Sequence, residues 1–249
     1  MGKAQDFAAL HVKGTPVELY NCWDAGSAAA ITAAGAPAIA TGSWGVAAAQ
    51  GFVDGQDMPL ADVLALVTRI VAASDVPVTV DFEGAYGDAP EIVASHAKAL
   101  AATGAVGMNF EDRYVGGAGI WPVDAQAARI AAIRAAVGPD FYINARTDLF
   151  LQSDAEDHAG LVEEAVSRGQ AYADAGASGF FVPKLGDGDL IAQVCRDVPL
   201  PVNVMMHDGL AARDVLEAAG VARISYGPSS YVAAMQKVTE AAKLIYDPR

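Results

Sequence analysis

The amino-acid sequence predicts a single (β/α)8 barrel, also called a TIM barrel, that covers residues 1–249. Eight apolar segments of strand length alternate with alanine-rich segments of helical period, and eight βα units in about 250 residues are typical of this fold. No linker or low-complexity segment divides the chain. A doubly wound sheet is the alternative fold, but the segment NCWDAGSA after the first strand lacks the G-x-G-x-x-G pattern of a dinucleotide site.

The predicted strands recur about every thirty residues along the chain, with helical segments between them. They are VELYN at 17–21, PAIATG at 37–42, PVTVDFE at 77–83, VGMNFE at 106–111, FYINAR at 141–146, GFFVPK at 179–184, PVNVMM at 201–206 and RISYG at 223–227. Asp24 is expected to cap the first helix after the first strand. A left-handed glycine is expected to end each of four helices, at Gly35, Gly104, Gly176 and Gly220.

The chain is acidic, with 30 acidic and 16 basic residues and a formal net charge of −14. This charge repels nucleic acid and anionic membrane surfaces, so we expect neither as a partner, whereas a small anion remains compatible if a metal ion or an arginine binds it. The sequence has no apolar run near the ~20 residues of a membrane helix and no secretory signal, which predicts a cytoplasmic protein. Cys22 and Cys195 lack neighbours at metal-ligand or redox-motif spacing, so no zinc site or disulfide framework is predicted.

Charged residues near the strand ends share one face of their strands, opposite the large apolar residues. Asp81 and Glu83 on the third strand have the same parity as Glu111 on the fourth, and Arg146 on the fifth shares it. Because barrel enzymes build their sites at the carboxyl ends of the strands, three carboxylates would converge there and repel one another without a cation. Oxygen ligands without histidine or cysteine favour Mg²⁺ or Mn²⁺. The alternative is that each acid caps a helix or pairs with a lysine.

Three other residues each have two interpretations. Asp54, in GFVDGQD, is either a metal ligand or a turn former before glycine. Lys184, at the end of the sixth strand, is either the nucleophile of a metal-free Schiff-base aldolase or the partner of an acid at the rim. Trp44 either forms the wall of a pocket or packs in the core.

Eight features occur in a fixed order between residues 21 and 228: NCWDAGSA, AIATGS, Asp54, PVTVDFEGAYG, GMNFEDR, INARTD, PVNV and RISYGPS. In this order they resemble the isocitrate lyase and phosphoenolpyruvate mutase superfamily, in particular its phosphonomutase-like and 2-methylisocitrate lyase-like branch. The specific part of the resemblance is the combination of the acidic pair after the third strand, Glu-Asp after the fourth and Ala-Arg-Thr after the fifth.

The resemblance implies a barrel whose last helix is exchanged between subunits, a homodimer or homotetramer, and catalysis with Mg²⁺ on a small anionic 2-oxo acid or enolpyruvyl compound. It implies that Asp81 ligates the metal directly and that the other acids hold it largely through water. It also implies that two backbone amides, of Gly42 and Ser43, bind the substrate carboxylate. The predicted metal residues are Asp81, Glu83, Glu111 and Asp54, the predicted catalytic residues are Arg146, Glu111 and Asp54, and the predicted substrate-binding residues are Thr41, Gly42, Ser43, Trp44, Arg146 and Asn203.

After the fourth strand the chain reads EDRYVGGAGIWP, which has neither the Cys-Gly-His acid of the superfamily's isocitrate-type lyases nor the lid sequence of its mutases. No proton donor is therefore assigned, and the glycines of this segment predict a mobile lid over residues 113–122. The predicted function is an Mg²⁺-dependent lyase that breaks a C–C bond of, or decarboxylates, a 2-oxo acid or related small dicarboxylate through an enolate. The alternatives are a P–C phosphonomutase or hydrolase of the same superfamily, a Lys184 aldolase, and a non-catalytic ligand-binding barrel.

Overall fold

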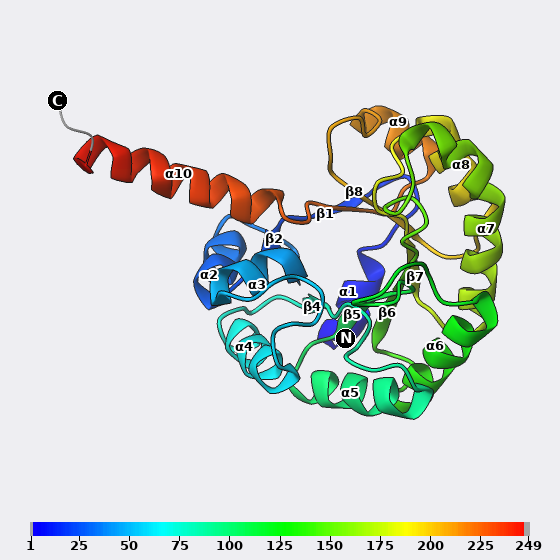
Figure 1. Ribbon diagram of the computed structural model, residues 1–249, viewed down its shortest axis with the longest axis horizontal. Coiled ribbons are helices and arrows are strands. Elements are labelled where there is room, and N and C mark those ends of the chain that lie inside the picture. The colour runs from blue at the N-terminus through cyan, green and yellow to red at the C-terminus, as the bar shows by residue number, and fades with distance from the viewer. Residues whose placement is uncertain (1, 247–249) are drawn as a thin grey trace.

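The computed structural model describes residues 2–246, and within them nine parallel strands form a nearly closed barrel (Figure 1). The strands are β1 (Val17–Leu19), β2 (Asn21–Cys22), β3 (Ile39–Thr41), β4 (Val78–Asp81), β5 (Gly107–Glu111), β6 (Tyr142–Arg146), β7 (Gly179–Phe181), β8 (Val202–Met205) and β9 (Arg223–Ser225). Their order in the sheet is β1-β9-β8-β7-β6-β5-β4-β3-β2. Only Tyr20 separates β1 from β2, so one run of chain pairs with β9 at its start and with β3 at its end, which closes the ring.

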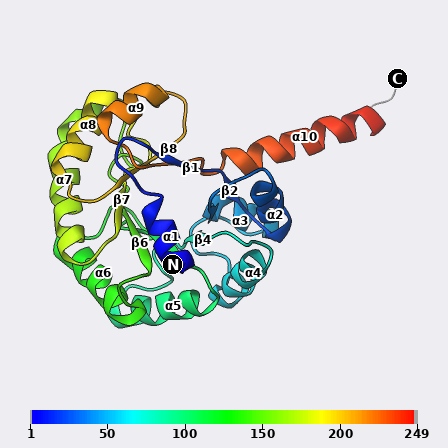
Figure 2. The same ribbon diagram turned by 180° about the vertical axis from the view of Figure 1, so that it is seen from behind.

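Helices cover the outside of this ring, as Figures 1 and 2 show from opposite sides. The helices of the described chain are α1 (Lys3–Ala9), α2 (Ala25–Ala33), α3 (Ser43–Gln50), α4 (Leu60–Ala72), α5 (Pro90–Ala102), α6 (Val123–Val137), α7 (His158–Asp174), α8 (Gly188–Asp197), α9 (Arg213–Ala219) and α10 (Ser229–Tyr246), with a short 3-10 helix at Ala155–Asp157. All but α1 and α10 lie around the outside of the ring. Large apolar side chains of the strands, such as Phe110, Ile143 and Phe180, are fully buried against these helices. The predicted barrel is thereby confirmed, with its first strand divided in two at Tyr20.

The local signals at the helix ends are also confirmed. Asp24 caps α2 through a capping box in which its carboxylate accepts a hydrogen bond of 2.7 Å from the Ser27 amide, while the Ser27 hydroxyl accepts one from the Asp24 amide. Backbone φ angles of 90° to 97° place the four expected glycines in the left-handed region that ends a helix, and these are Gly35, Gly104, Gly176 and Gly220.

The amino-terminal end of the barrel is closed by α1, which lies across it in Figure 2. Phe7 packs its ring edge against Tyr142 with centroids 5.2 Å apart, and His11 stacks on the same ring at 4.3 Å. Tyr142 fits inside the barrel only because residue 179 is glycine: a β-carbon there would lie 2.6 Å from the Tyr142 hydroxyl. The carboxyl ends of the strands form the opposite mouth.

Helix α10 does not pack along the barrel as the other outer helices do, but projects away from it beside α2 and α3 (Figure 1). Along its length it leaves apolar side chains exposed, among them Val238, Leu244, Ile245 and Tyr246. Across residues 2–246, no helix is both long enough and apolar enough to cross a membrane. The cytoplasmic location stays a prediction.

Candidate active site

Residues at the carboxyl ends of the strands surround a cavity of about 240 Å³. One side of it, which we call the polar side, consists of Asn21, Gly42, Ser43, Asp54, Asp81, Asn109, Arg113 and Arg146. A second part of the lining, which we call the apolar wall, consists of Leu151, Phe181, Pro183 and Met205. It meets the polar side where the Arg146 guanidinium lies 5.9 Å from the centre of the Phe181 ring. Trp44, Ser225, Gly227 and Pro228 complete the lining. The cavity therefore lies where the sequence predicted a site, at the mouth of the barrel.

Asp81, the last residue of β4, is held in place by hydrogen bonds to residues of β3, α3 and β5. Its backbone amide donates to the Thr41 hydroxyl at 2.9 Å. Its carboxylate accepts a hydrogen bond of 3.2 Å from the Ser43 amide and one of 3.4 Å from the side chain of Asn109, which in turn accepts from Asn144 at 2.9 Å. The carboxylate is thus oriented by fixed dipoles before any ligand binds.

Arg146, the last residue of β6, connects the acids of the cavity. Its Nε and Nη2 donate to the two carboxylate oxygens of Asp148 at 2.5 and 3.0 Å, and its Nη1 lies 3.0 Å from Glu111 and 3.9 Å from Asp81. Burial alone would lower the pKa of Arg146, but the carboxylates of Glu111, Asp148 and Asp81 outweigh burial and raise it. The guanidinium therefore stays charged, with its edges directed by Asp148 and Glu111.

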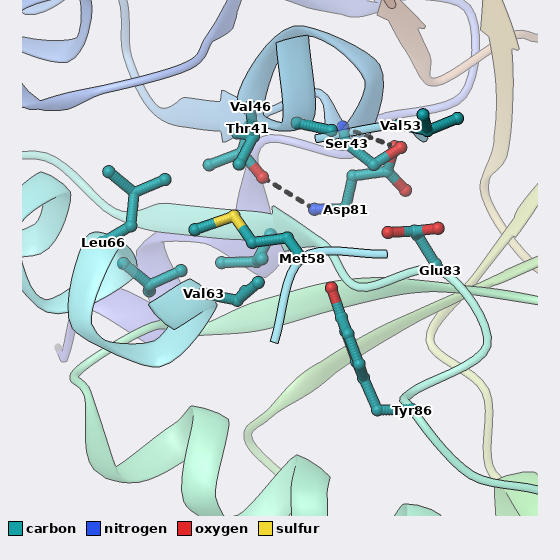
Figure 3. A pocket seen from close by; sticks show the side chains of 13 residues that line it. Thr41, Ser43, Val46, Val53, Met58, Val63, Leu66, Asp81, Glu83 and Tyr86 are labelled. Carbon is teal, nitrogen blue, oxygen red and sulfur yellow. Dashed lines mark hydrogen bonds between the residues drawn. The ribbon is translucent and has the colours of Figure 1, made fainter. Parts of the chain in front are cut away.

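Glu83 lies in the turn just after β4, beside a second, smaller cavity of about 20 Å³ (Figure 3). That cavity is large enough for about one water molecule, and Met58, Val63 and Leu66 form its apolar side. The hydroxyl of Tyr86 points toward the Glu83 carboxylate in Figure 3. Glu83 has a φ angle of 50°, in the left-handed region that a non-glycine residue seldom adopts, so the turn directs its side chain at a cost in backbone strain.

The acids of the site repel one another, which is visible in their pKa values. Burial first, and then the charges of Asp54 and Asp81, raise the pKa of Glu83 to about 8. Asp54 lies in an exposed turn but lines the cavity; partial burial and the charge of Asp81 raise its pKa as well. Burial also raises the pKa of Glu111, against the opposing charge of Arg146. The site has an excess of negative charge that a cation would neutralise.

The donor set fits a hard divalent cation held mostly through water. Within residues 2–246, no three carboxylate, imidazole or thiolate side chains lie close enough together to ligate one ion directly. The family resemblance implies only Asp81 as a direct ligand, and Mg²⁺ commonly keeps several waters and takes one or two carboxylates. Asp54, Glu83 and Glu111 carry the oxygen atoms that such waters would contact. The metal site remains a proposal.

A family model described as phosphoenolpyruvate phosphomutase matches residues 7–246. The chain belongs to this family. The sequence-based assignment to the isocitrate lyase and phosphoenolpyruvate mutase superfamily is thereby confirmed.

Among the relatives of this family member are proteins named for different enzymatic reactions. A crystal structure from Burkholderia cenocepacia J2315, of a protein described as a phosphonomutase, is 46% identical, covers 97% of this chain and 98% of its own, and superimposes with a TM-score of 0.94. The 2-methylisocitrate lyase of Escherichia coli K12 is 32% identical over 96% of this chain and 82% of the lyase. A phosphonopyruvate hydrolase in complex with oxalate and Mg²⁺, at 23% identity, a TM-score of 0.86 and coverage of 99% and 88%, shares the fold.

The backbone amides predicted to bind the substrate have partners within the protein. The Gly42 amide donates to the Cys22 carbonyl at 3.2 Å, and the Ser43 amide donates to Asp81. Among the described residues, no acceptor faces the amides of Trp44 and Gly45 in the first turn of α3. Of these two residues only Trp44 lines the cavity, so its amide is a further candidate, beside the predicted pair, to receive a carboxylate.

The remaining predicted residues separate into those at the cavity and those below it. Trp44 lines the cavity, is 43% exposed and contacts Tyr231 of α10 edge-on at 5.9 Å. Thr41 lies behind Asp81 and lines the smaller cavity. Asn203 lies outside the lining and donates to the Ser225 hydroxyl at 3.2 Å. Lys184 is exposed and, like every lysine of the described chain, lies outside the cavity lining.

The segment predicted as a lid folds into a small hairpin over the polar side. Arg113 pairs with Ile120 in an antiparallel bridge, and the rings of Tyr114 and Trp121 pack 4.2 Å apart. Arg113 also places its Nε 3.3 Å from Glu111 and lines the cavity. Two aromatic residues of this segment thus contact each other, while its mobility stays a prediction.

The sequence analysis missed a buried network behind Arg146. Asp112 is fully buried and accepts hydrogen bonds from the Asp148 amide at 2.9 Å, the Tyr172 hydroxyl at 2.9 Å and Arg168 at 3.2 Å. This network fixes Asp148 and thereby the direction of Arg146. The four residues of the apolar wall were missed as well. Strand parity was the available signal, because Phe181 and Pro183 alternate with Val182, and Met205 has the parity of Asn203.

Proposed function

We propose that this protein is an Mg²⁺-dependent lyase that breaks a C–C bond of, or decarboxylates, a small anionic 2-oxo acid through an enolate. The observation that carries the proposal is that Asp81 and Arg146, 3.9 Å apart, line one cavity, with each side chain held by further hydrogen bonds. A cation site beside a fixed guanidinium suits a substrate whose negative charge moves onto an oxygen during reaction.

Asp81 would hold the cation directly, and Asp54, Glu83 and Glu111 would hold its waters. When bound, the ion would neutralise these acids and polarise the carboxylate and 2-oxo oxygens of the substrate. Arg146 binds the substrate oxygen that gains charge, and Asp148 keeps the guanidinium in the required orientation. The first turn of α3 offers the Trp44 amide to the substrate carboxylate.

Three alternatives remain distinguishable. A P–C mutase or hydrolase would use the same polar side, as suggested by the phosphonopyruvate hydrolase that shares the fold. A Schiff-base aldolase requires a lysine in the cavity, and the exposure of Lys184 argues against it. A non-catalytic barrel would bind a 2-oxo acid and Mg²⁺ without turnover.

The test is a panel of 2-oxo acids, 2-hydroxy diacids and phosphonates incubated with Mg²⁺ or with chelator, with products followed by NMR. Cleavage of a C–C bond that depends on Mg²⁺ supports the proposal. Release of phosphate from a phosphonate supports the mutase or hydrolase alternative, and trapping of substrate by borohydride supports the aldolase. Oxalate binding without turnover of any compound would indicate a binding protein.

We also propose that α10 packs on a second copy of the chain, in a homodimer or homotetramer. An isolated helix that projects into solvent with Ile245 75% exposed and Leu244 84% exposed leaves apolar area without cover. Ile245→Asp should shift the protein to monomer in size-exclusion chromatography with light scattering. Gln236→Asp, on the same exposed helix but at a polar position, is the matched control and should leave the assembly unchanged. A wild-type monomer would contradict the proposal.

A further inference from the structure

The apolar wall has a chemical consequence for the substrate. Phe181 and Pro183 are buried at the end of β7, Met205 is half-buried at the end of β8, and Leu151 is 39% exposed in the loop after β6. None of these side chains carries a charge or a hydrogen-bond donor. A group of the substrate that lies against them must therefore leave water without gaining a polar partner.

The cationic groups that line the cavity are already engaged with carboxylates. Within the described lining only Arg113 and Arg146 are basic, and no lysine or histidine is present. Arg146 directs its three nitrogens at Asp148 and Glu111, which leaves two of its five N–H groups for the 2-oxo acid end of the substrate, and the Arg113 Nε lies 3.3 Å from Glu111. None of the four side chains of the wall is basic, so a second anionic group that lies against them would gain no ion pair from the wall, and its burial there would be unfavourable.

We propose that the apolar wall binds an uncharged alkyl or aryl substituent, so that the substrate is a 2-oxo acid with one anionic end and one apolar end. This inference rests on the proposed function, because the polar side is taken to bind the 2-oxo acid group. The wall distinguishes such a substrate from a 2-oxo diacid or a phosphonate, whose distal anion would face Phe181 and Met205 unpaired.

The reaction class that suits this substrate is aldol cleavage of a 4-hydroxy-2-oxo acid. The bond between C3 and C4 breaks, and its electron pair remains on C3 as the enolate of the 2-oxo acid fragment. The C4 hydroxyl gives its proton to water and becomes the carbonyl of a neutral aldehyde, while C3 takes a proton from water to complete the 2-oxo acid. The charge then stays at the polar side near Arg146, and the fragment that leaves along the apolar wall is uncharged.

Binding of two inert ligands of the same shape tests the wall without reference to turnover. 2-Oxoglutarate ends in a carboxylate, and 5-methyl-2-oxohexanoate replaces that carboxylate by an isopropyl group. In calorimetry with Mg²⁺ present, we expect the isopropyl ligand to bind at least ~10-fold more tightly, since its end buries apolar area against the wall. Leu151→Arg supplies a guanidinium at the exposed edge of the wall and should reverse the preference. Val12→Arg, at an exposed position outside the cavity lining, should keep it.

Equal or tighter binding of 2-oxoglutarate by the wild type would overturn the inference while leaving the proposed function intact, provided that both ligands need Mg²⁺. Oxalate is the reference probe for the polar side alone. Absence of oxalate binding in the presence of Mg²⁺ would overturn the proposed function and the inference together. A reversed preference in Leu151→Arg combined with an unchanged one in Val12→Arg supports the assignment of the wall.

Discussion

The polar side and the apolar wall of the cavity differ in how their residues are held and in the kind of ligand group that each can bind. On the polar side, Asp81 is directed by hydrogen bonds that it accepts from Ser43 and Asn109, and Arg146 is directed by those that it donates to Asp148. The apolar wall is positioned by packing and strand geometry, and its side chains donate no hydrogen bond. The difference indicates a division of tasks: the polar side determines where charge is placed, and the wall determines what else the substrate carries.

Of the changes that test this difference, removal of Asp81 should have the largest effect, and the affected quantity is Mg²⁺ binding at the polar side. We expect Asp81→Ala to abolish Mg²⁺ binding in calorimetry, because it deletes the one proposed direct ligand and leaves the other acids to repel one another. Asp62→Ala removes the same charge from the exposed face of α4 and should leave Mg²⁺ affinity unchanged. Equal Mg²⁺ affinity in the wild type and Asp81→Ala would place the ion elsewhere and make the polar side a set of ion pairs.

Arg146→Lys should have the next largest effect and separates a role in the reaction from a role in structure. Lysine keeps the charge but loses the planar fork that contacts Asp148 and Glu111, so we expect turnover to fall by ~100-fold with Mg²⁺ affinity nearly retained. Arg196→Lys, at an exposed pair with Asp197, serves as the control. If melting temperature and Mg²⁺ affinity fall in parallel with activity, Arg146 serves mainly to hold the acids.

Strand alternation explains why the polar side was predictable. A charge at a strand end is conspicuous in sequence, and the period of two places Asp81, Glu111 and Arg146 on the inner face. Helix ends were predictable for a similar local reason, since Asp24 and glycines such as Gly35 act within one turn of chain.

Height along the barrel and conformation beyond the strands could not be predicted in this way. Asn203 has the inward parity but lies outside the lining, which Met205 reaches two residues further along β8, because alternation fixes the face and not the depth. Glu83 follows the end of β4 in a left-handed turn, where strand parity no longer applies. The apolar wall escaped notice because Phe181 and Met205 resemble core residues in a sequence.

The pH dependence of stability offers a third test of the polar side, with a smaller effect. The folded-state pKa of Glu83 is raised from 4.5 to about 8, so folding favours its protonated form. This contribution to stability is present below pH 4.5 and is lost as pH rises through about 8. In chelator, the melting temperature should therefore fall between about pH 5 and pH 8.5, and Glu83→Gln should flatten part of that fall.

Glu163→Gln, on the exposed face of α7, is the matched control for Glu83→Gln and should retain the full decline. Mg²⁺ should also reduce the decline in the wild type, because a bound cation favours the ionised acids. An unchanged slope in Glu83→Gln would show that Glu83 is not the residue whose ionisation opposes folding.

The smallest expected effect concerns Met205 and tests whether the apolar wall binds the alkyl end of the ligand. Met205→Leu conserves volume and apolar character, so the affinity for 5-methyl-2-oxohexanoate should stay within ~3-fold of the wild type. Met205→Gln conserves the shape of the side chain but adds an amide, which must lose water when the alkyl end of the ligand binds; we expect a loss of about 5-fold or more. Oxalate, which ends short of the wall, should bind both variants as it binds the wild type. If Met205→Gln weakens the binding of oxalate as much as the binding of the alkyl ligand, Met205 supports the shape of the whole cavity. Substrate selection would then not follow from the difference between the polar side and the apolar wall.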